Sequence, residues 1–169
     1  MFLDEFGANT RMQRTHGRAA PGQRVLAAVP HGHYKSIGTI AALSAVGIVA
    51  SVTFDGGGTT AARFVDFVRD RLVPALRPGQ VLVLDNLAAH HDKRVDGLVG
   101  SAGCRVMRLP PYSPDFNPIE NAISKVKALL RKLARRTVPE LFEAIPLALA
   151  TVTAADAVGY FGHCGYATA

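Results

Sequence analysis

The amino-acid sequence predicts an α/β fold in which helices flank a mixed five-stranded sheet, with a three-strand meander followed by parallel strands. Three observations support this prediction. Segments of strand length, rich in apolar and β-branched residues, fill the first third of the chain. Val81–Leu84 is a continuous apolar run, as expected for a central strand that is covered on both faces. Strand-like and helix-like segments then alternate, which is typical of α/β folds.

The first third of the chain is expected to supply most of the strands. Phe2–Phe6 has the pattern of a strand that begins almost at the first residue. A polar connection follows, and Val25–Val29 is predicted as a short strand. Tyr34–Leu43 and Gly47–Phe54 are predicted to pair as a hairpin. Asp55–Gly58 is glycine-rich like a phosphate loop, but no Gly-Lys-Ser/Thr follows, so it is interpreted as a turn.

Helices are predicted on both sides of the apolar run. Thr59 or Thr60 is expected to cap a helix that Pro74 stops. A second helix is predicted from about residue 91 to residue 99, and a strand over Cys104–Leu109. Near the end, Thr137 marks the start of another helix, and a last segment ends at residues 161–166.

The segment from Leu109 to Lys127 combines a proline-rich loop with a helix start. Asn117 is the expected N-cap, Pro118 the first helical residue and Glu120 the third. Apolar residues then recur every three or four positions, which predicts one buried stripe: Ile119, Ala122, Ile123, Val126, Leu129, Leu130 and Leu133. Glu120 lies off this stripe. It is either a capping-box residue that bonds back to the Asn117 amide or a ligand for a metal ion.

The composition limits the classes of protein to which this chain can belong. The 169 residues suggest a single domain, 1–169, and 49% hydrophobic residues make wholesale disorder unexpected. Nineteen basic against thirteen acidic residues give a net charge of +6, which favours a polyanionic partner, nucleic acid first. Cys104 and Cys164 are expected to be reduced thiols. The sequence shows no secretory signal and no apolar run long enough to span a membrane, so we expect a cytoplasmic protein.

Three acidic residues share one feature, because each stands at an end of an apolar element. Asp4 ends the first apolar run, Asp85 follows the central strand, and Glu120 opens the helix. Three converging carboxylates repel one another unless cations neutralise them. Oxygen ligands suit Mg²⁺ or Mn²⁺, and a pair of such ions can catalyse an in-line phosphoryl displacement. We therefore predict a site for two divalent ions.

The same residues resemble the bacterial insertion-sequence branch of the mariner superfamily, whose members are DDE-type transposases with a ribonuclease-H-like catalytic fold. The resemblance covers nearly the whole chain. It rests on Phe-Leu-Asp-Glu at 2–5, Leu-Asp-Asn-x-x-x-His at 84–90 and Tyr-Ser-Pro-Asp-Phe-Asn-Pro-Ile-Glu-Asn at 112–121. The 35-position step from Asp85 to Glu120 also resembles that group. One departure is Ile123, where the family often has Trp.

The resemblance implies roles for individual residues. Asp4, Asp85 and Glu120 become the catalytic, metal-binding triad; Glu5 is the rival of Asp4, but alternation along a strand lets only one of two neighbours face the site. The expected supporting residues are Asn86, His90 and Asn117. The basic residues that we expect to contact DNA phosphates, or else to form an ordinary solvated face, are Arg14, Arg18, Lys125, Lys127 and Arg131.

The resemblance also implies a function. It predicts metal-dependent cleavage of double-stranded DNA at the ends of a mobile element, strand transfer into target DNA, and a homodimer in the DNA complex. Family members normally carry an N-terminal helix-turn-helix region, which is expected to be absent here and could be encoded separately. Two alternatives stay open: a catalytically idle DNA-binding or regulatory half of a split transposase, and a stand-alone ribonuclease-H-like nuclease. A bacterial protein of this kind would associate with the nucleoid when bound to DNA.

Overall fold

The computed structural model describes residues 1–56, 58–111 and 113–167. Gly57 of the expected turn and Tyr112 of the proline-rich motif lie outside the described residues, as do residues 168 and 169. Five strands form one mixed sheet in the order β3-β2-β1-β4-β5. Their bounds are β1 Phe2–Asn9, β2 Ser36–Ser44, β3 Gly47–Asp55, β4 Val81–Leu84 and β5 Arg105–Arg108. The predicted α/β architecture is therefore confirmed.

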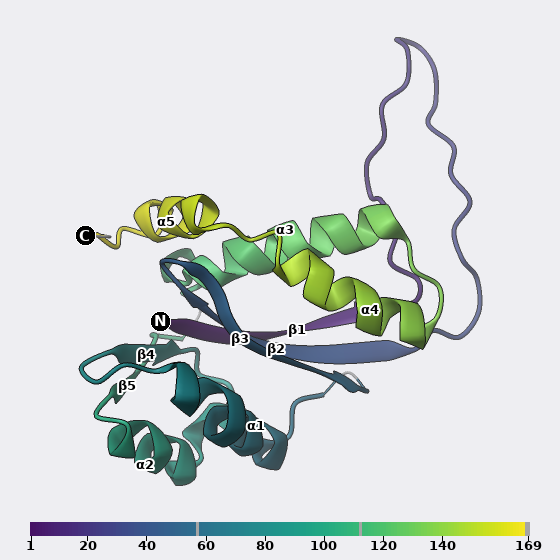
Figure 1. Cartoon of the computed structure of the whole chain (residues 1–169). Coiled ribbons are helices and arrows are strands. Elements are labelled where there is room, and N and C mark those ends of the chain that lie inside the picture. The colour runs from purple at the N-terminus through teal and green to yellow at the C-terminus, as the bar shows by residue number, and fades with distance from the viewer. Residues whose placement is uncertain (57, 112, 168–169) are drawn as a thin grey trace.

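Helices cover both faces of this sheet (Figure 1). On one face lie α3, α4 and α5, and on the other lie α1 and α2. The α-helices are α1 Ala61–Phe67, α2 Lys93–Ser101, α3 Pro118–Leu133, α4 Val138–Leu149 and α5 Ala154–His163. Short helical turns follow α1 over Val68–Leu72 and Val73–Ala75, and others lie at Ala88–His91 and Pro114–Phe116.

The sheet has a separate apolar core on each face. Phe2, Phe6 and Ala8 of β1 belong to the core under α3, α4 and α5. Leu3 points the other way, into the core that contains Phe64 of α1. This alternation follows from the two-residue period of a strand. Consecutive side chains of β1 therefore lie on opposite faces of the sheet.

The register of β1 and β4 decides which residues meet at the end of the sheet. β1 pairs antiparallel with β2 over its whole length, but it pairs with β4 only at Phe2 and Val83, in parallel. Extending this parallel register by two residues places Asp4 beside Asp85. Because β4 ends at Leu84 while β1 continues to Asn9, no strand among the described residues pairs with this edge of β1 beyond that point.

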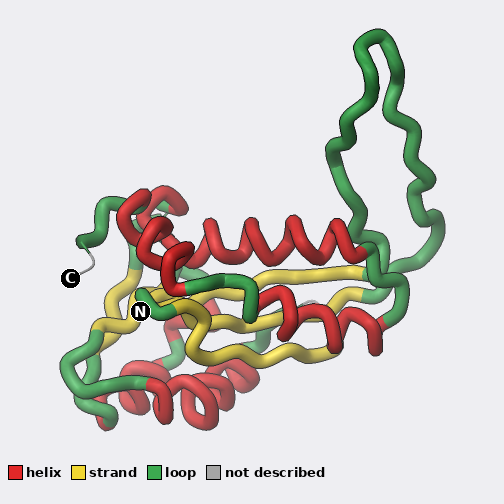
Figure 2. The backbone as a smooth tube through the Cα atoms, turned by 45° about the horizontal axis from the view of Figure 1, so that its top comes forward, coloured by secondary structure: helices red, strands yellow, loops and turns green. Residues whose placement is uncertain are grey.

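The segment between β1 and β2 differs from the sequence prediction. Val25–Val29 is not a strand; it lies in a long arm that projects from the body (Figures 1 and 2). Leu26 is 83% exposed there. The residues have strand propensity, but in the part of the chain that the structure describes no strand or helix covers them, so the propensity is not sufficient to form sheet.

The helix that starts at Pro118 forms as predicted. Asn117 precedes it, and Ala134 ends it in the left-handed conformation, with φ 50°. Most of the apolar stripe is buried in the core under α3: Ile119, Ala122, Ile123, Val126 and Leu130. Leu133, in the last turn, is 37% exposed.

The remaining helices also follow local signals. Thr60 caps α1 by accepting a hydrogen bond from the Arg63 amide, and Thr137 begins α4 with a complete capping box to Glu140. Both cysteines are buried free thiols. Within the described residues no single helix is long and apolar enough to cross a membrane, and only α4 and α5 together reach that length and composition, with a 75° bend between them.

Candidate active site

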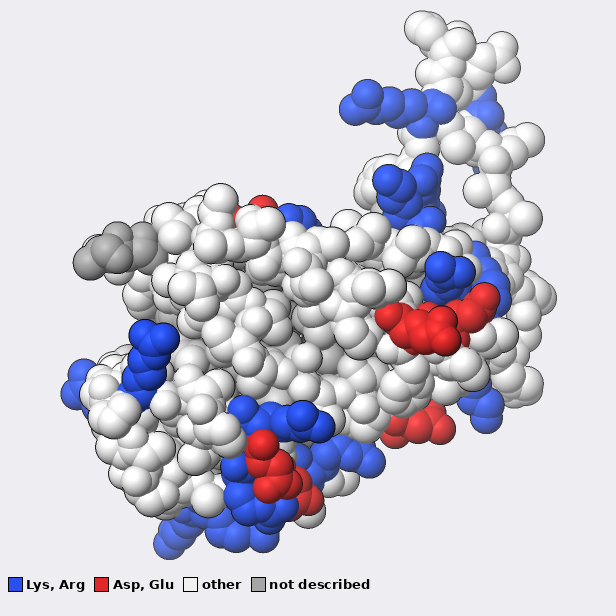
Figure 3. All heavy atoms as spheres, in the orientation of Figure 1, with Lys and Arg blue, Asp and Glu red and all other residues white. Residues whose placement is uncertain are grey.

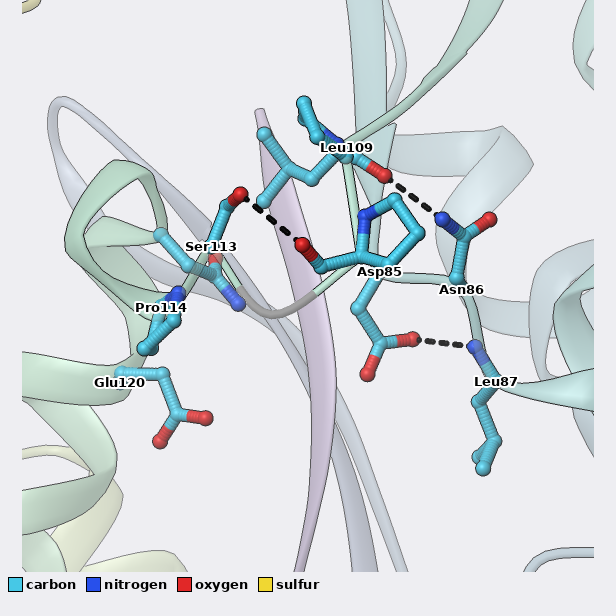
Figure 4. Close-up of a pocket in the computed structure, with 10 residues that line it drawn as sticks. Asp85, Asn86, Leu87, Leu109, Ser113, Pro114 and Glu120 are labelled. Carbon is cyan, nitrogen blue, oxygen red and sulfur yellow. Dashed lines mark hydrogen bonds between the residues drawn. The ribbon is translucent and has the colours of Figure 1, made fainter.

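A cleft of about 440 Å³ opens where the loops after β4 and β5 meet the start of α3. Figure 4 shows Asp85 and Glu120 on its two sides, with the ribbon of β1 behind them. The lining residues come from three segments that are distant in the sequence: Asp85, Asn86, Leu87, Leu109, Pro110, Pro111, Ser113, Pro114, Asn117 and Glu120. The cleft therefore lies beyond the carboxyl ends of the parallel strands, where α/β sheets commonly bind ligands.

Asp4 lies beside this cleft, on the face of β1 that α3 covers. Its side chain is only 6% exposed. The Asn117 amide donates a hydrogen bond to Asp4 Oδ2 at 3.0 Å, and the Glu5 backbone N–H donates to Oδ1 at 2.7 Å. Both of these donors are uncharged. A buried carboxylate with only neutral donors is unfavourable in its ionised form.

The electrostatic state of Asp4 reflects this environment. Burial raises the pKa of Asp4 to about 7, against the lowering effect of the Glu5 amide. The negative charges of Glu120, Asp85 and Glu5 contribute to this increase in the pKa. The acidic residues predicted from the sequence are therefore close enough to interact, and their interaction is repulsive.

Asp85 follows β4 directly and is held by the turn after it. Its Oδ1 accepts a hydrogen bond from the Leu87 backbone N–H at 2.9 Å and contacts His90 Nδ1 at 2.7 Å. The hydrogen bond from His90 lowers the pKa of Asp85 below its usual value, although partial burial opposes this. Asp85 thus stays ionised where Asp4 tends to hold a proton.

Glu120 enters the cleft from the first turn of α3, and its side chain is exposed. The Glu120 backbone N–H donates to the Asn117 carbonyl oxygen at 3.0 Å. The Asn117 side chain makes no capping bond to the helix and binds Asp4 instead. The alternative role of Glu120 in a capping box does not appear in this geometry, and its carboxylate is directed into the cleft (Figure 4).

Glu5 and His90 lie on the opposite face of β1 from Asp4. The His90 side chain is fully buried, and its Nε2 contacts Glu5 Oε1 at 2.9 Å. Burial lowers the pKa of His90, but hydrogen bonds to Asp85 and Glu5 and the charges of these carboxylates outweigh it and raise the pKa to about 9. Glu5 is thus a partner of His90, and it does not share the position of Asp4.

The donor atoms are of the type that binds a divalent cation, although the three carboxylates do not converge on one point in this structure. Asp4, Asp85 and Glu120 are all hard oxygen donors, and Asp4 lacks a cationic partner in its hydrogen bonds. Within residues 1–56, 58–111 and 113–167, however, no three His, Cys, Asp or Glu side chains are gathered closely enough to hold an ion. Asp85 is turned toward His90, and Glu120 enters the cleft from the other side.

The basic residues singled out in the sequence separate into groups. Lys127 and Arg131 of α3 line a hollow of about 490 Å³ with the free edge of β1, and Arg14 shares a neighbouring hollow with Arg131. Arg18 is exposed on the projecting arm, and blue Lys and Arg atoms are visible on that arm in Figure 3.

Lys125 has a different position from the one its sequence pattern suggested. Its Nζ donates to Asp156 Oδ2 at 2.6 Å and to the Thr151 carbonyl oxygen at 2.8 Å. It therefore ties α3 to the start of α5, because Asp156 also belongs to the capping box of that helix. This ion pair engages the Lys125 ammonium within the domain, and its contact with phosphate stays a prediction.

Two contacts around the site were not foreseen from the sequence. The first is the bond from Asn117 to Asp4, which joins α3 to β1. The second is the bridge that His90 forms between Glu5 and Asp85. The only signals in the sequence were the adjacency of Asp4 and Glu5 and the Asp-Asn-x-x-x-His spacing. Asn86 also acts locally: it donates to the Leu109 carbonyl oxygen at 2.9 Å and joins the loops after β4 and β5.

The sheet order, the helices on both faces and the acidic cleft define a domain with the ribonuclease-H-like fold. The chain belongs to the family described as DDE superfamily endonuclease, whose model matches residues 1–141. This range contains Asp4, Asp85 and Glu120.

Solved structures of Mos1 transposase have a similar fold. A Mos1 transposase paired-end complex with the left transposon end is 18% identical with a TM-score of 0.74, and the match covers 96% of this chain and 50% of that one. The Mos1 catalytic domain with raltegravir and Mg is 14% identical with a TM-score of 0.69, covering 96% and 76%. The chain thus spans about half the length of the Mos1 chain in the paired-end complex. No curated protein matches the chain significantly.

Proposed function

We propose that this chain is the catalytic domain of a transposase, which cleaves DNA strands at the ends of a mobile element and transfers them into target DNA. The observation that carries the proposal is that Asp85, directly after β4, and Glu120 of α3 line one cleft, and that their charges raise the pKa of the neighbouring Asp4 of β1. Membership of the DDE superfamily endonuclease family supports the same chemistry. Similar structures of Mos1 paired-end complexes with Mg and with Mn support the use of a divalent cation.

In this proposal Asp4, Asp85 and Glu120 hold two ions of Mg²⁺ or Mn²⁺. When bound, the ions supply Lewis acidity that activates the attacking oxygen and stabilises the leaving oxygen of an in-line displacement. Asn117 holds the Asp4 carboxylate in place, and Asn86 fixes the loop that carries Asp85. The reaction needs no covalent bond between DNA and protein, because the chain contributes position and charge.

The strand chemistry then proceeds in two displacements. Water attacks a phosphodiester at the element end, and the broken P–O bond leaves a free 3′-hydroxyl on the element strand. That hydroxyl attacks a phosphodiester of the target and releases the target's 3′-oxygen as a hydroxyl. The same carboxylates serve both steps, since each forms one P–O bond and breaks another.

The proposed partner is double-stranded DNA, bound along the side of the domain where Lys127 and Arg131 line the hollow next to β1. Arg14 and Arg18 on the arm extend this basic surface. Recognition of element ends is assigned to a helix-turn-helix region outside residues 1–169. A homodimer that joins two ends is proposed by analogy with the paired-end complex of Mos1 transposase.

The test is metal-dependent strand cleavage by this domain fused to a cognate end-binding region. The wild-type fusion is expected to nick element-end DNA with Mg²⁺ or Mn²⁺, and Asp85→Asn and Glu120→Gln are expected to abolish nicking. Glu143→Gln, an exposed change on α4, is the matched control. Equal cleavage by the wild type and the site variants would refute the triad assignment.

Two other outcomes identify the alternative functions. Binding of end DNA without cleavage, together with no carboxylate-dependent affinity for Mn²⁺, would show an idle regulatory protein. Cleavage of an RNA–DNA hybrid with none of element-end DNA would show a stand-alone nuclease.

A further inference from the structure

A continuous chain of contacts runs from the far face of β1 to the edge of the cleft. Glu5 Oε1 lies 2.9 Å from His90 Nε2, and His90 Nδ1 lies 2.7 Å from Asp85 Oδ1. The His90 side chain is fully buried and that of Glu5 is 12% exposed. A buried polar chain that ends on a carboxylate of the site requires a structural or functional reason, because burying such groups is costly.

The imidazole of His90 is fixed on every side. Its ring centroid lies 4.3 Å from that of Phe64, and both of its nitrogens face carboxylate oxygens. Its backbone carbonyl accepts a hydrogen bond from Arg108 Nη2 at 2.9 Å, and Arg108 is itself paired with Asp96 of α2. The ring therefore has a single orientation in which to meet Asp85.

This arrangement occupies one oxygen of Asp85 selectively. His90 Nδ1 and the Leu87 backbone N–H both bind Oδ1. The side chain of Asp85 remains 42% exposed at the cleft. With Oδ1 held by two donors, Oδ2 is the oxygen presented to the space between Asp85 and Glu120.

Glu5 is placed to act through His90 and not as a ligand. It follows Asp4 directly, so the alternation of β1 directs it to the opposite face of the sheet. Its contact with Nε2 fixes the far side of the ring whose near side binds Asp85. Side chains that hydrogen-bond to a metal-binding carboxylate or histidine support many metal sites, and their loss typically costs 10- to 100-fold in metal affinity or activity.

We propose that Glu5 and His90 are positioning residues, which hold the Asp85 carboxylate by Oδ1 so that Oδ2 is preset to bind a divalent cation. The inference rests on the proposed function, since it assumes that Asp85 is a metal ligand. It adds a role for Glu5 and explains why an acidic pair occurs at positions 4 and 5. Asp4 binds the metal ion directly, and Glu5, on the opposite face of β1, acts through His90.

The two ring nitrogens of His90 can be tested separately. In His90→Asn the side-chain amide can take the place of Nδ1 and still donate to Asp85 Oδ1. In His90→Gln the amide can take the place of Nε2, which preserves the contact with Glu5 and loses the donor to Asp85. Glu5→Ala removes the far anchor, and Glu5→Gln keeps its size and an acceptor oxygen. Glu143→Gln serves as the control.

The measurement is the affinity for Mn²⁺ by calorimetry, at a temperature where circular dichroism shows every variant folded, followed by kcat and KM for nicking by the fusion protein. We expect His90→Gln and Glu5→Ala to bind Mn²⁺ about 10- to 100-fold more weakly than wild type and to lose kcat with little change in KM for DNA. His90→Asn and Glu5→Gln are expected to retain affinity to within about 5-fold of wild type.

A purely structural role predicts a different pattern, in which His90→Asn and His90→Gln lose melting temperature alike and folded protein keeps wild-type Mn²⁺ affinity. That result would overturn the positioning role while leaving the proposed function intact. If the wild-type fusion itself neither binds Mn²⁺ nor cleaves DNA, the proposed function fails and the positioning role fails with it.

Discussion

The stability of the metal-free protein should increase when Asp4 is replaced by Asn. Asp4 is 6% exposed, and its carboxyl has a pKa raised to about 7 by burial and by the charges of Glu120, Asp85 and Glu5. Its two hydrogen-bond donors are the Glu5 amide and the Asn117 side chain. Because the Asn117 amide can flip to present its oxygen, a carboxamide at position 4 can keep both contacts without carrying a charge.

The sign of the effect follows from proton linkage. The pKa of Asp4 is higher in the folded protein than the ordinary aspartate value of 3.8, so between pH 4 and pH 7 the folded state keeps a proton that the unfolded state releases. The contribution of Asp4 to stability is therefore fully present at low pH and is lost as the pH rises through 7. The difference between the folded and unfolded pKa of Asp4 corresponds to roughly 4 kcal/mol in the free energy of unfolding. Relaxation of the site is expected to reduce this contribution to about 2–4 kcal/mol.

The assay is urea unfolding in EDTA at pH 4 and at pH 8, for wild type and Asp4→Asn. Other groups that titrate in this range, His90 among them, cancel in the difference between the two proteins. The free energy of unfolding of Asp4→Asn, relative to that of wild type, is expected to increase by about 2–4 kcal/mol from pH 4 to pH 8. Asp66→Asn, at an exposed position on α1, should show no such growth. If Asp4→Asn is less stable than wild type by the same amount at pH 4 and at pH 8, the explanation based on the pKa of Asp4 is wrong.

Three further predictions concern separate parts of the molecule. Lys125→Ala should lower the melting temperature, because it removes the tie from α3 to Asp156, and should leave DNA affinity unchanged in gel-shift titrations. Lys127→Ala and Arg131→Ala should leave the melting temperature unchanged and weaken DNA binding, each reducing the slope of log affinity against log salt by about 1. An unchanged slope would show that these two residues do not contact DNA. Ile119→Ala, at a fully buried position of α3, should cost about 3 kcal/mol in urea unfolding, and a loss below 1 would contradict the packing described.

Much of the fold could be predicted from local patterns in the sequence. The start of α3 was readable because Asn117, Pro118 and the apolar stripe act within one or two turns of helix. The buried run at Val81–Leu84 also identified β4 from its own composition. Val25–Val29 has equally suitable composition for a strand but lies exposed on the arm. Whether a strand forms depends on a partner in the sheet, which a local pattern does not contain.

The site shows the same division between local and distant information. The ends of strands and the start of a helix identified Asp85 and Glu120 as candidates, since α/β sheets present such positions at one edge. Strand alternation also predicted that only one of Asp4 and Glu5 faces the site, and the family resemblance favoured Asp4. The partners of these residues depend on the register of β1 with β4 and on the position of Asn117, across separations of 85 and 113 residues. For the same reason Lys125 could not be separated from Lys127 by sequence spacing alone.

The central claim is that Asp4, Asp85 and Glu120 form one metal site, and the most direct test is the position of the metal itself. Crystals of the protein soaked in Mn²⁺ can be measured for anomalous scattering, which locates manganese without assuming any ligand. We expect an anomalous peak in the cleft between β1, β4 and the start of α3, within ligand distance of oxygens from all three carboxylates. A cleft without manganese at saturating Mn²⁺, or a peak bound by other residues, would contradict it.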